Sequence, residues 1–379
     1  MKITEIRGYH LQYRLAEPVR NAVAVMTHRE SLVVELVTGS GVCGWGESLR
    51  QPESAWSFVE SQLAAVVLGR PPDDRARLWQ AMRQHRAGHE TAMLAASALD
   101  MAMWDLQGRI ESRPVTELLG GRVRERLTAY LSGPFMRPGA DPYVDVLADT
   151  ERFMAAGFRA FKVRAGVAPA SDGVMLAGLR EHVGPDISLM TDLNAGYALP
   201  AASDAIARCA GAGLLWVEEP LHTSDLDGYE RLRDTAAVPV AGGESLSGLR
   251  QFAAFVGRRA LSILQPDLSI CGGFTGAMKV AALAEAAETP MMPHVFGTVV
   301  NFYASLQLGA VLPGYRIADG REYPFFEYDH MDNALRSLLG EPGVAADGTI
   351  SVPDAPGIGI ELSREQLRPY VRRAWQVSA

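Results

Sequence analysis

The sequence predicts an α/β fold, namely a modified (β/α)8 TIM-type barrel that carries an N-terminal α+β capping domain. The main observation is a series of short apolar runs, separated by helical patterns, that begins near Leu127. Buried parallel strands have near-continuous apolar sequences because helices cover both faces of their sheet. We count eight runs: Leu127–Tyr130, Ala160–Val163, Ile187–Leu193, Leu214–Val217, Val238–Ala241, Leu261–Leu264, Pro290–Pro293 and Tyr323–Phe326. This count, and the absence of a G-x-G-x-x-G motif after the first run, favours a closed barrel over an open doubly wound sheet.

The N-terminal part of the chain has a different pattern. Alternating apolar and polar residues predict antiparallel strands at Lys2–Leu15 and Ser31–Thr38, joined by a polar connection at Glu17–Glu30. Ala, Leu, Met and Trp then recur three and four residues apart over Thr91–Gly108, which predicts a helix. Strands followed by helices indicate an α+β domain.

These changes of pattern suggest where the parts of the chain begin and end. We expect the capping domain to cover residues 1–125 and the barrel to cover residues 126–340. The last segment, 341–379, is rich in proline and glycine. We expect it to be irregular and to return to the capping domain.

Composition and charge argue against several classes of protein. The chain is 48% hydrophobic and 21% charged, as in ordinary soluble globular proteins, and it has no uncharged run of about 18 residues that could span a membrane. Its formal net charge of -8 leaves no basic surplus to neutralise phosphates, so we expect no nucleic acid partner. Three widely separated cysteines fit a reducing cytoplasm better than a disulfide framework.

Polar or charged residues stand at the ends of successive predicted strands. In a barrel these ends meet on one face, where the active sites of this fold lie. The residues are, in chain order, Lys162, Arg164, Asp192, Asn194, Glu218, Glu219, Glu244, Asp267, His294 and Glu327. The sequence therefore predicts a functional site on that face.

Three acids from neighbouring strands indicate a metal site. Asp192, Glu218 and Glu244 would repel one another if they were brought together without a cation. Oxygen ligands alone favour Mg²⁺, with Mn²⁺ as a substitute. Salt bridges to lysines and arginines at the barrel mouth are the alternative interpretation. Glu218 and Glu219 are adjacent, so only one of the two can point along the barrel axis.

The other strand ends provide groups that can move or stabilise a proton. Asp267 and His294 end neighbouring strands, and a carboxylate bonded to one imidazole nitrogen leaves the other nitrogen free for acid–base chemistry. Lys162 and Arg164 are two residues apart on one strand, so their side chains share a face. Both can bind and polarise a carboxylate, but Arg164 cannot act as a base because guanidinium stays protonated.

Several stretches resemble the enolase superfamily, in particular its mandelate racemase and muconate lactonizing enzyme family. They are Gly44–Glu47, Ala98–Asp105, Leu118–Gly121, Trp216–Pro220 and Pro353–Gly359. The resemblance covers nearly the whole chain. It implies a Mg²⁺-dependent enzyme that acts on a small-molecule carboxylate, and a homo-oligomer.

The resemblance also implies roles for individual residues. Mg²⁺ ligation would fall to Asp192, Glu218 and Glu244, and the catalytic dyad to His294 and Asp267. The substrate contacts would be Asn194, Lys162, Arg164 and Glu327, of which Glu327 would hydrogen-bond the enediolate oxygen. The segments at about 17–30 and 48–56 match the two capping-domain loops that cover the substrate in this family.

One departure from the family pattern bears on the reaction. Racemases and many dehydratases of the mandelate-racemase-like subgroup of this family have Lys-x-Lys where this chain has Lys162-Val163-Arg164. Racemisation needs a proton acceptor on each side of the α carbon, so the arginine disfavours it. His294 then acts as base or acid, and whether Lys162 is itself a base stays open.

We therefore expect a dehydratase that converts a sugar acid to a 2-keto-3-deoxy acid. Pro293–Thr298 and Phe326–Asp329 are similar to segments of enzymes that act on sugar acids and their lactones, which makes a sugar-lactone cycloisomerase the first alternative. An epimerase or racemase is the second. A catalytically silent Mg²⁺-binding barrel is the third.

Overall fold

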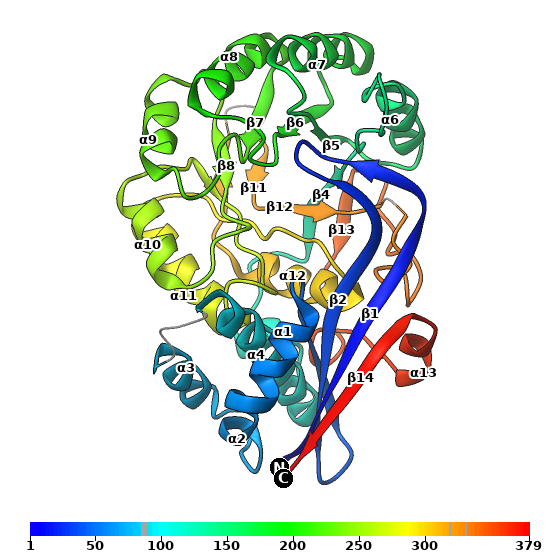
Figure 1. Ribbon diagram of the computed structural model, residues 1–379, viewed down its shortest axis with the longest axis vertical. Coiled ribbons are helices and arrows are strands. Elements are labelled where there is room, and N and C mark those ends of the chain that lie inside the picture. The colour runs from blue at the N-terminus through cyan, green and yellow to red at the C-terminus, as the bar shows by residue number, and fades with distance from the viewer. Residues whose placement is uncertain (85–88, 318–319, 331) are drawn as a thin grey trace.

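The computed structural model describes residues 1–84, 89–317, 320–330 and 332–379. A four-stranded antiparallel sheet forms the N-terminal part, in the order β14-β1-β2-β3. Its strands are β1 (Ile3–Arg20), β2 (Val25–Thr38), β3 (Cys43–Ser48) and β14 (Val371–Ser378). The first and last strands pair with each other, so the two ends of the chain lie together at the bottom of Figure 1.

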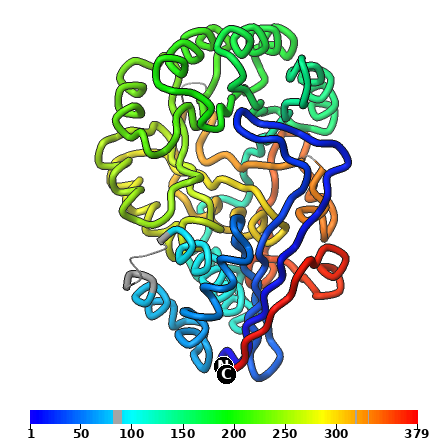
Figure 2. The backbone as a smooth tube through the Cα atoms, in the orientation of Figure 1, coloured from blue at the N-terminus to red at the C-terminus, as the bar shows by residue number. Residues whose placement is uncertain are grey.

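The connection predicted at residues 17–30 is mostly strand, and this part of the prediction was wrong. β1 and β2 continue through it as one long hairpin, pairing Val19 with Met26 and Arg20 with Val25. Only the turn between them is left, where the Asn21 side chain accepts hydrogen bonds from two backbone amides. A hairpin ladder is made by backbone groups, so polar side chains do not prevent it. The blue hairpin reaches up to the barrel in Figures 1 and 2.

Helices cover one face of this sheet. They are α1 (Pro52–Phe58), α2 (Ala64–Val67), α3 (Arg75–Gln84), α4 (His89–Glu111) and α5 (Val115–Leu118), with a π-helical turn at Val59–Leu63. The helix predicted at 91–108 is α4, which extends further at both ends. Gly46 of β3 lies directly against the backbone of α4 at Ala98 and Ala102, where any side chain would collide. The close approach of helix and strand therefore requires glycine.

The barrel strands are parallel and neighbours in sequence are neighbours in space. They are β4 (Arg126–Ser132), β5 (Ala160–Arg164), β6 (Ser188–Asp192), β7 (Leu214–Glu218), β8 (Val240–Gly242), β9 (Ile263–Leu264) and β12 (Phe325–Tyr328), in the order β12-β4-β5-β6-β7-β8-β9. Around them lie α6 (Val146–Ala155), α7 (Pro169–Val183), α8 (Leu199–Cys209), α9 (Leu226–Thr235), α10 (Leu249–Gly257), α11 (Gly273–Ala286) and α12 (Val299–Val311). Figure 1 shows these helices as an outer ring, as the predicted α/β barrel requires.

Two of the eight predicted strands differ most from the structure, and β8 and β9 each begin two residues later than predicted. The run at 290–293 forms two isolated parallel bridges, Leu264 with Met291 and Asp267 with His294, rather than a regular strand. Pro290 and Pro293 explain this, because proline has no N–H to donate to a ladder. The last strand, β12, lies two residues later than predicted, because Pro324 separates it from the short strand β11 (Glu322–Tyr323), which pairs with β10 (Tyr315–Arg316).

The last segment has more regular structure than we predicted. It contains β13 (Thr349–Ser351), which pairs antiparallel with β4, as well as α13 (Arg364–Leu367) and β14. Its prolines and glycines lie between these elements. The division of the chain at about residues 125 and 340 stays a prediction. In the described residues, no helix combines the length and apolarity needed to cross a membrane.

The tip of the β1–β2 hairpin packs onto the barrel loops that follow β5 and β6. A Cβ atom at Gly166 would lie 2.7 Å from the Cβ of Ala22, and the same holds at Gly196. Gly166 also has a φ of +98°, in the region that favours glycine. The hairpin therefore lies over the barrel mouth because two glycines leave room for its tip.

Glu47 joins the N-terminal sheet to the barrel. Its buried carboxylate accepts hydrogen bonds from the Ser31 hydroxyl (2.5 Å) and from the Thr298 hydroxyl (2.6 Å). It also accepts bonds from the amides of Thr298 and Asn301, both at 2.9 Å. These amides lie at the first turn of α12, where backbone donors have no partner inside the helix. Glu47 thereby fixes the segment that follows His294.

We expect Glu47→Ala to lower the free energy of unfolding by about 2–4 kcal/mol, because it leaves buried donors of α12 without an acceptor. Urea denaturation followed by circular dichroism measures this. The control is Glu60→Ala, at an exposed position of the same N-terminal part, which should stay within about 0.5 kcal/mol of the unchanged protein. Equal stabilities of the two variants would contradict the role of Glu47.

Candidate active site

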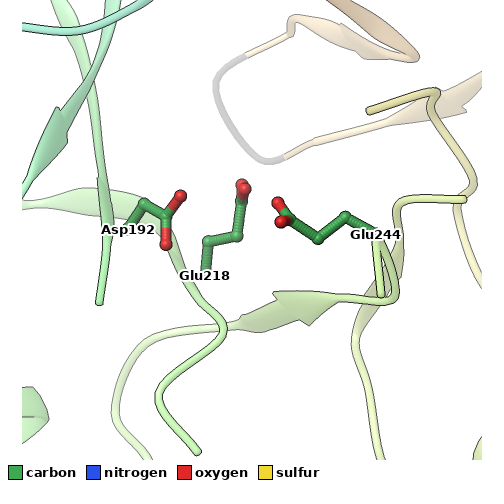
Figure 3. A group of neighbouring side chains, drawn as sticks. All are labelled: Asp192, Glu218 and Glu244. Atoms are coloured by element: carbon green, nitrogen blue, oxygen red, sulfur yellow. The ribbon is translucent and has the colours of Figure 1, made fainter. Parts of the chain in front are cut away.

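Three acids meet at the carboxyl ends of the barrel strands. Asp192 ends β6, Glu218 ends β7 and Glu244 follows β8. Figure 3 shows their carboxylates pointing toward one another, and one oxygen from each lies within 4.8 Å of the others. Asp192 and Glu218 are fully buried and the Glu244 side chain is 14% exposed. The structure thus brings together the three acids that the sequence singled out.

The structure separates the two adjacent acids, Glu218 and Glu219. Glu218 belongs to the cluster, where Gln265 (2.6 Å) and Trp216 (3.1 Å) donate hydrogen bonds to its second oxygen. Glu219 has a backbone φ of +37°, and its side chain lies outside the cluster of three carboxylates. Burial, together with Glu244 and Glu218, raises the pKa of Glu219 to about 8. A protonated Glu219 adds no further charge to the cluster at neutral pH.

Lys162 and Arg164 of β5 are the cations in contact with these acids. The Lys162 ammonium bonds Glu218 and lies 2.7 Å from Glu327 and 3.8 Å from Asp192. The Arg164 guanidinium bonds Asp192 and donates to the Ser132 hydroxyl at 2.8 Å. Lys162 is 0% exposed, so these carboxylates stand in place of its hydration. The side chains of Lys162 and Arg164 thus lie on the same face of β5, as predicted.

His294 and Asp267 form the predicted pair. The Asp267 carboxylate lies 2.7 Å from His294 Nδ1, and its other oxygen accepts from Ser269 (2.5 Å) and Asn301 (3.2 Å). His294 Nε2 faces Glu244 at 3.1 Å. Burial opposes protonation, but the carboxylates of Glu244, Glu327 and Asp267 outweigh it and raise the pKa of His294 to about 10. In the metal-free protein His294 is therefore an imidazolium.

Glu327 lies between Lys162 and His294. One oxygen is 2.7 Å from Lys162 Nζ, while the other accepts from the Val295 amide at 2.9 Å and is 3.9 Å from His294 Nε2. Burial favours its neutral form, yet the charges of Lys162, His294 and Arg164 hold the pKa of Glu327 well below its usual range. Glu327 is thus a charged group that links the two sides of the site.

Asn194 holds Asp192 in the structure. Its amide and its side-chain nitrogen donate to the two oxygens of Asp192, at 2.7 and 3.0 Å. The Asn194 side-chain oxygen has no hydrogen-bond partner among the residues that the structure describes. Asn194 also lines the cavity described next, where its side chain can make the predicted contact with a substrate.

A cavity of about 350 Å³ lies above these groups. Its barrel side includes Arg164, Asn194, Glu244 and His294. The N-terminal part supplies the opposite wall: Asn21, Val25, Met26, Thr27, His28, Arg29, Glu30, Leu49 and Arg50. These residues fall in the two segments, 17–30 and 48–56, that the sequence indicated as covering a substrate.

Some residues of the site were not predicted. Gln265 supports Glu218 and lies two residues before Asp267, so strand alternation could have placed it on the same face. Arg50 lies 3.8 Å from Glu244, and Phe296 stacks on His294 with ring centres 6.3 Å apart. Asn301 and Ser269 act through Asp267. The contact of Asn301 is long-range, whereas Ser269 lies only two residues after Asp267.

The charges of the described site fit a divalent cation. Five carboxylates are in contact here, those of Asp192, Glu218, Glu244, Asp267 and Glu327. Three buried cations balance them, Lys162, Arg164 and protonated His294, and five minus three leaves two negative charges. Arg50 stands at the rim, where its side chain is 38% exposed. The oxygen-only donor set of Asp192, Glu218 and Glu244 suits Mg²⁺ or Mn²⁺.

Two family models match this chain. The N-terminal domain model of the mandelate racemase / muconate lactonizing enzymes matches residues 3–120, and the enolase C-terminal domain-like model matches residues 145–366. The chain belongs to this family of the enolase superfamily. The family resemblance stated from the sequence is confirmed, and so is the α/β barrel with its N-terminal cap.

Relatives in this family cover nearly the whole chain. D-galactarolactone cycloisomerase of Agrobacterium fabrum is 35% identical over 98% of this chain and 99% of its own length. The 3,6-anhydro-alpha-L-galactonate cycloisomerase of Streptomyces coelicolor is 31% identical, covering 94% and 96%. Arabinonate dehydratase of Saccharolobus solfataricus is 29% identical, covering 97% and 99%.

Solved structures of the superfamily agree in fold. An enolase superfamily member from Polaromonas sp. JS666 aligns over 98% of both chains with a TM-score of 0.89 and 29% identity. L-talarate dehydratase from the same organism, crystallised with Mg and L-glucarate, aligns over 100% of this chain and 99% of its own. Its TM-score is 0.84 and its identity 27%.

We expect removal of the Asp267 charge to lower the pKa of His294. In metal-free wild-type protein the imidazolium should persist to about pH 10, because three carboxylates surround it. Asp267→Asn should lower this pKa by roughly one to two units. Nuclear magnetic resonance of isotope-labelled histidine, titrated in the presence of a chelator, reports the value. The partly exposed His182 serves as internal control. A wild-type pKa near 6.5 would contradict the electrostatic account.

Proposed function

We propose that this chain is a Mg²⁺-dependent enzyme that removes the proton α to the carboxylate of a sugar acid and expels a leaving group from the β carbon. The observation that carries the proposal is the buried cluster of Asp192, Glu218 and Glu244, with two negative charges uncompensated and Lys162 and His294 on either side of Glu327. The acid-sugar dehydratases and cycloisomerases among its relatives support this reaction class.

Asp192, Glu218 and Glu244 would hold the ion. When bound, Mg²⁺ supplies positive charge that stabilises the enediolate formed on loss of the α proton. Lys162 and Arg164, both buried, add fixed positive charge beside the carboxylate of the substrate. Such charge is most effective where burial lowers the local dielectric.

His294 is the group we propose to hold the transferred proton. As a base it would take the α proton, and as an imidazolium it would give a proton to the departing oxygen. Asp267 fixes the ring through Nδ1, which leaves Nε2 for this role. Glu327 lies beside both His294 and Lys162, and after taking a proton from one of these two groups it would donate a hydrogen bond to the developing enediolate.

The leaving group distinguishes two candidate reactions. Dehydration of an open-chain sugar acid expels hydroxide and gives a 2-keto-3-deoxy acid, as the sequence led us to expect. The second candidate is cycloisomerisation, in which a ring oxygen leaves and no water is lost. It is favoured by the two relatives at 35% and 31% identity, both of which are cycloisomerases. Racemisation is disfavoured because Arg164, bound to Asp192 and Ser132, replaces the second lysine.

We further propose that the protein works in the cytoplasm as a homo-oligomer on small molecules, without nucleic acid or membrane partners. The formal net charge of -8 supports the exclusion of polyanions. The names of the relatives, all enzymes of sugar-acid chemistry, support a metabolic role.

The reaction is tested with the protein and Mg²⁺ in deuterated buffer against C4 to C6 sugar mono- and diacids and their lactones, followed by proton nuclear magnetic resonance. Loss of an α-proton signal with a 3-deoxy product of dehydration establishes the dehydratase. The same loss with an isomeric product of equal mass establishes the cycloisomerase. His294→Asn separates its two roles, because loss of exchange marks a base and retained exchange without product marks an acid. No exchange with any member would refute the sugar-acid function and leave the silent barrel.

We expect Asp192→Asn to weaken Mg²⁺ binding at least tenfold and to lower kcat/KM by about a thousandfold, because it removes a ligand charge from the cluster. Calorimetric titration with Mg²⁺ measures the first effect and the assay above measures the second. The matched control is Asp204→Asn, at an exposed position of α8, which should change neither. Full Mg²⁺ affinity in Asp192→Asn would show that the ion binds elsewhere.

A further inference from the structure

Arg29 is a buried cation that the proposed chemistry does not use. It lies on β2, its side chain is 4% exposed, and it lines the cavity above the site. Two of its guanidinium nitrogens, Nε and Nη2, have no hydrogen-bond partner in the described part of the chain. A guanidinium loses its hydration on burial, so unpaired donors of this kind call for an anion.

The contacts of Arg29 within the protein are weak. Its Nη1 faces the sulfur of Met26 at 3.8 Å, and its Nη2 lies 3.7 Å from Asp329, beyond hydrogen-bond distance. The guanidinium stacks over Phe296 at 4.2 Å. Burial lowers the pKa of Arg29, Asp329 opposes this, and the nearby Arg164 adds to it. The protein therefore orients the guanidinium and places its charge near Asp329, but leaves two of its nitrogens without a hydrogen-bond acceptor in the described residues.

Two aromatic rings contact both Arg29 and a residue of the proposed active site. The centre of the Phe296 ring lies 4.2 Å from the Arg29 guanidinium and 6.3 Å from the centre of the His294 ring. Phe135 has Arg29 at 5.4 Å and Arg164 at 4.8 Å from its centre. Arg29 thus contacts two aromatic rings, of which Phe296 also contacts His294 and Phe135 also contacts Arg164. A six-carbon sugar acid spans roughly 6 Å between its terminal carbons, given ordinary bond lengths.

The other charged groups of this wall are already engaged. Glu30 lies 3.2 Å from His10 and 3.8 Å from His28, and Arg50 lies 3.8 Å from Glu244. Arg29 also borders a second, larger cavity of about 520 Å³ with Arg137, Arg152 and Asp332, and its stacking on Phe296 keeps it beside the first. Among these groups, Arg29 is the buried one whose donors lack a hydrogen-bond partner in the described residues.

We propose that Arg29 binds the distal carboxyl group of the substrate, so that the enzyme acts on dicarboxylic sugar acids or on their lactones. This rests on the proposed function and names its substrate class. In an open diacid the distal group is the second carboxylate. In a diacid lactone it is the ring carboxyl, which becomes a carboxylate when the ring oxygen leaves. The carbon–oxygen bond breaks, its electron pair goes to that oxygen, and Arg29 meets the new negative charge.

This contact predicts discrimination between diacids and monoacids. A sugar monoacid ends in a neutral hydroxymethyl group, which leaves the buried guanidinium unpaired. A site built around a charged group rejects analogues that lack its partner more strongly than an apolar pocket rejects a missing methylene. Arg29 is therefore a specificity-determining residue rather than a catalytic one.

The test compares galactarate with galactonate and glucarate with gluconate, each pair differing only in the distal group, together with the lactones of the two diacids. Binding in the presence of Mg²⁺ is measured by calorimetry, and α-proton exchange is followed in parallel. Wild-type protein should bind the better diacid on the order of 100-fold more tightly than the matching monoacid. Arg29→Met, which keeps the length of the side chain, should remove this difference while changing monoacid binding less than about threefold.

Two further variants make the result specific. Arg29→Lys keeps the charge without the planar fork and should restore part of the preference. Arg14→Met, at an exposed position of the same hairpin, should leave it intact. Thermal melting verifies that each variant is folded. Equal binding of diacid and monoacid by wild-type protein, or an equal loss of both in Arg29→Met, overturns the inference. Tight diacid binding without exchange would uphold the role of Arg29 and refute the proposed reaction.

Discussion

The contact of Lys162 with Glu218 and Glu327 is the interaction on which the site depends. Burying a lysine with no exposure is costly, and burying several carboxylates side by side is more so. The ammonium of Lys162 and the carboxylates stabilise one another, because contacts between opposite charges replace the lost hydration; Lys162 and Glu327 are 2.7 Å apart. The balance is incomplete by two charges, however, so the barrel mouth fits a divalent cation rather than stability alone.

The cavity exists because two parts of the chain close on each other. Glu47 ties the N-terminal sheet to the first turn of α12, directly after the segment with His294 and Phe296. The β1–β2 hairpin then reaches over the barrel, with Ala22 against the glycines at 166 and 196. The reacting groups thus come from rigid strand ends, while the opposite wall comes from the hairpin. This division lets the wall change specificity without disturbing the chemistry.

Much of the site could be predicted because the carboxyl ends of parallel strands meet on one face of the barrel, so residues at successive strand ends lie close together. Asp192 and Glu218 each end a strand and Glu244 directly follows one, so the barrel brings them together. The predicted pair of Asp267 and His294 follows in the same way from neighbouring strand ends. Where proline interrupts the pattern, at 290–293 and at Pro324, the prediction of regular strands failed, because ladder bonding depends on N–H groups that apolar character does not reveal.

The sequence by itself determined the barrel, the order of its strands and the acids at their ends, since these depend on local periodicity and on one repeating geometry. The family resemblance chose Glu218 over Glu219, and the tertiary structure supplied the physical reason, the backbone angle of Glu219. Only the tertiary structure decided that residues 17–30 form a hairpin and that Arg29 is buried with unpaired donors above the site. These facts depend on a backbone angle and on contacts between residues far apart in the chain. No local pattern carries such information, because long-range packing settles it.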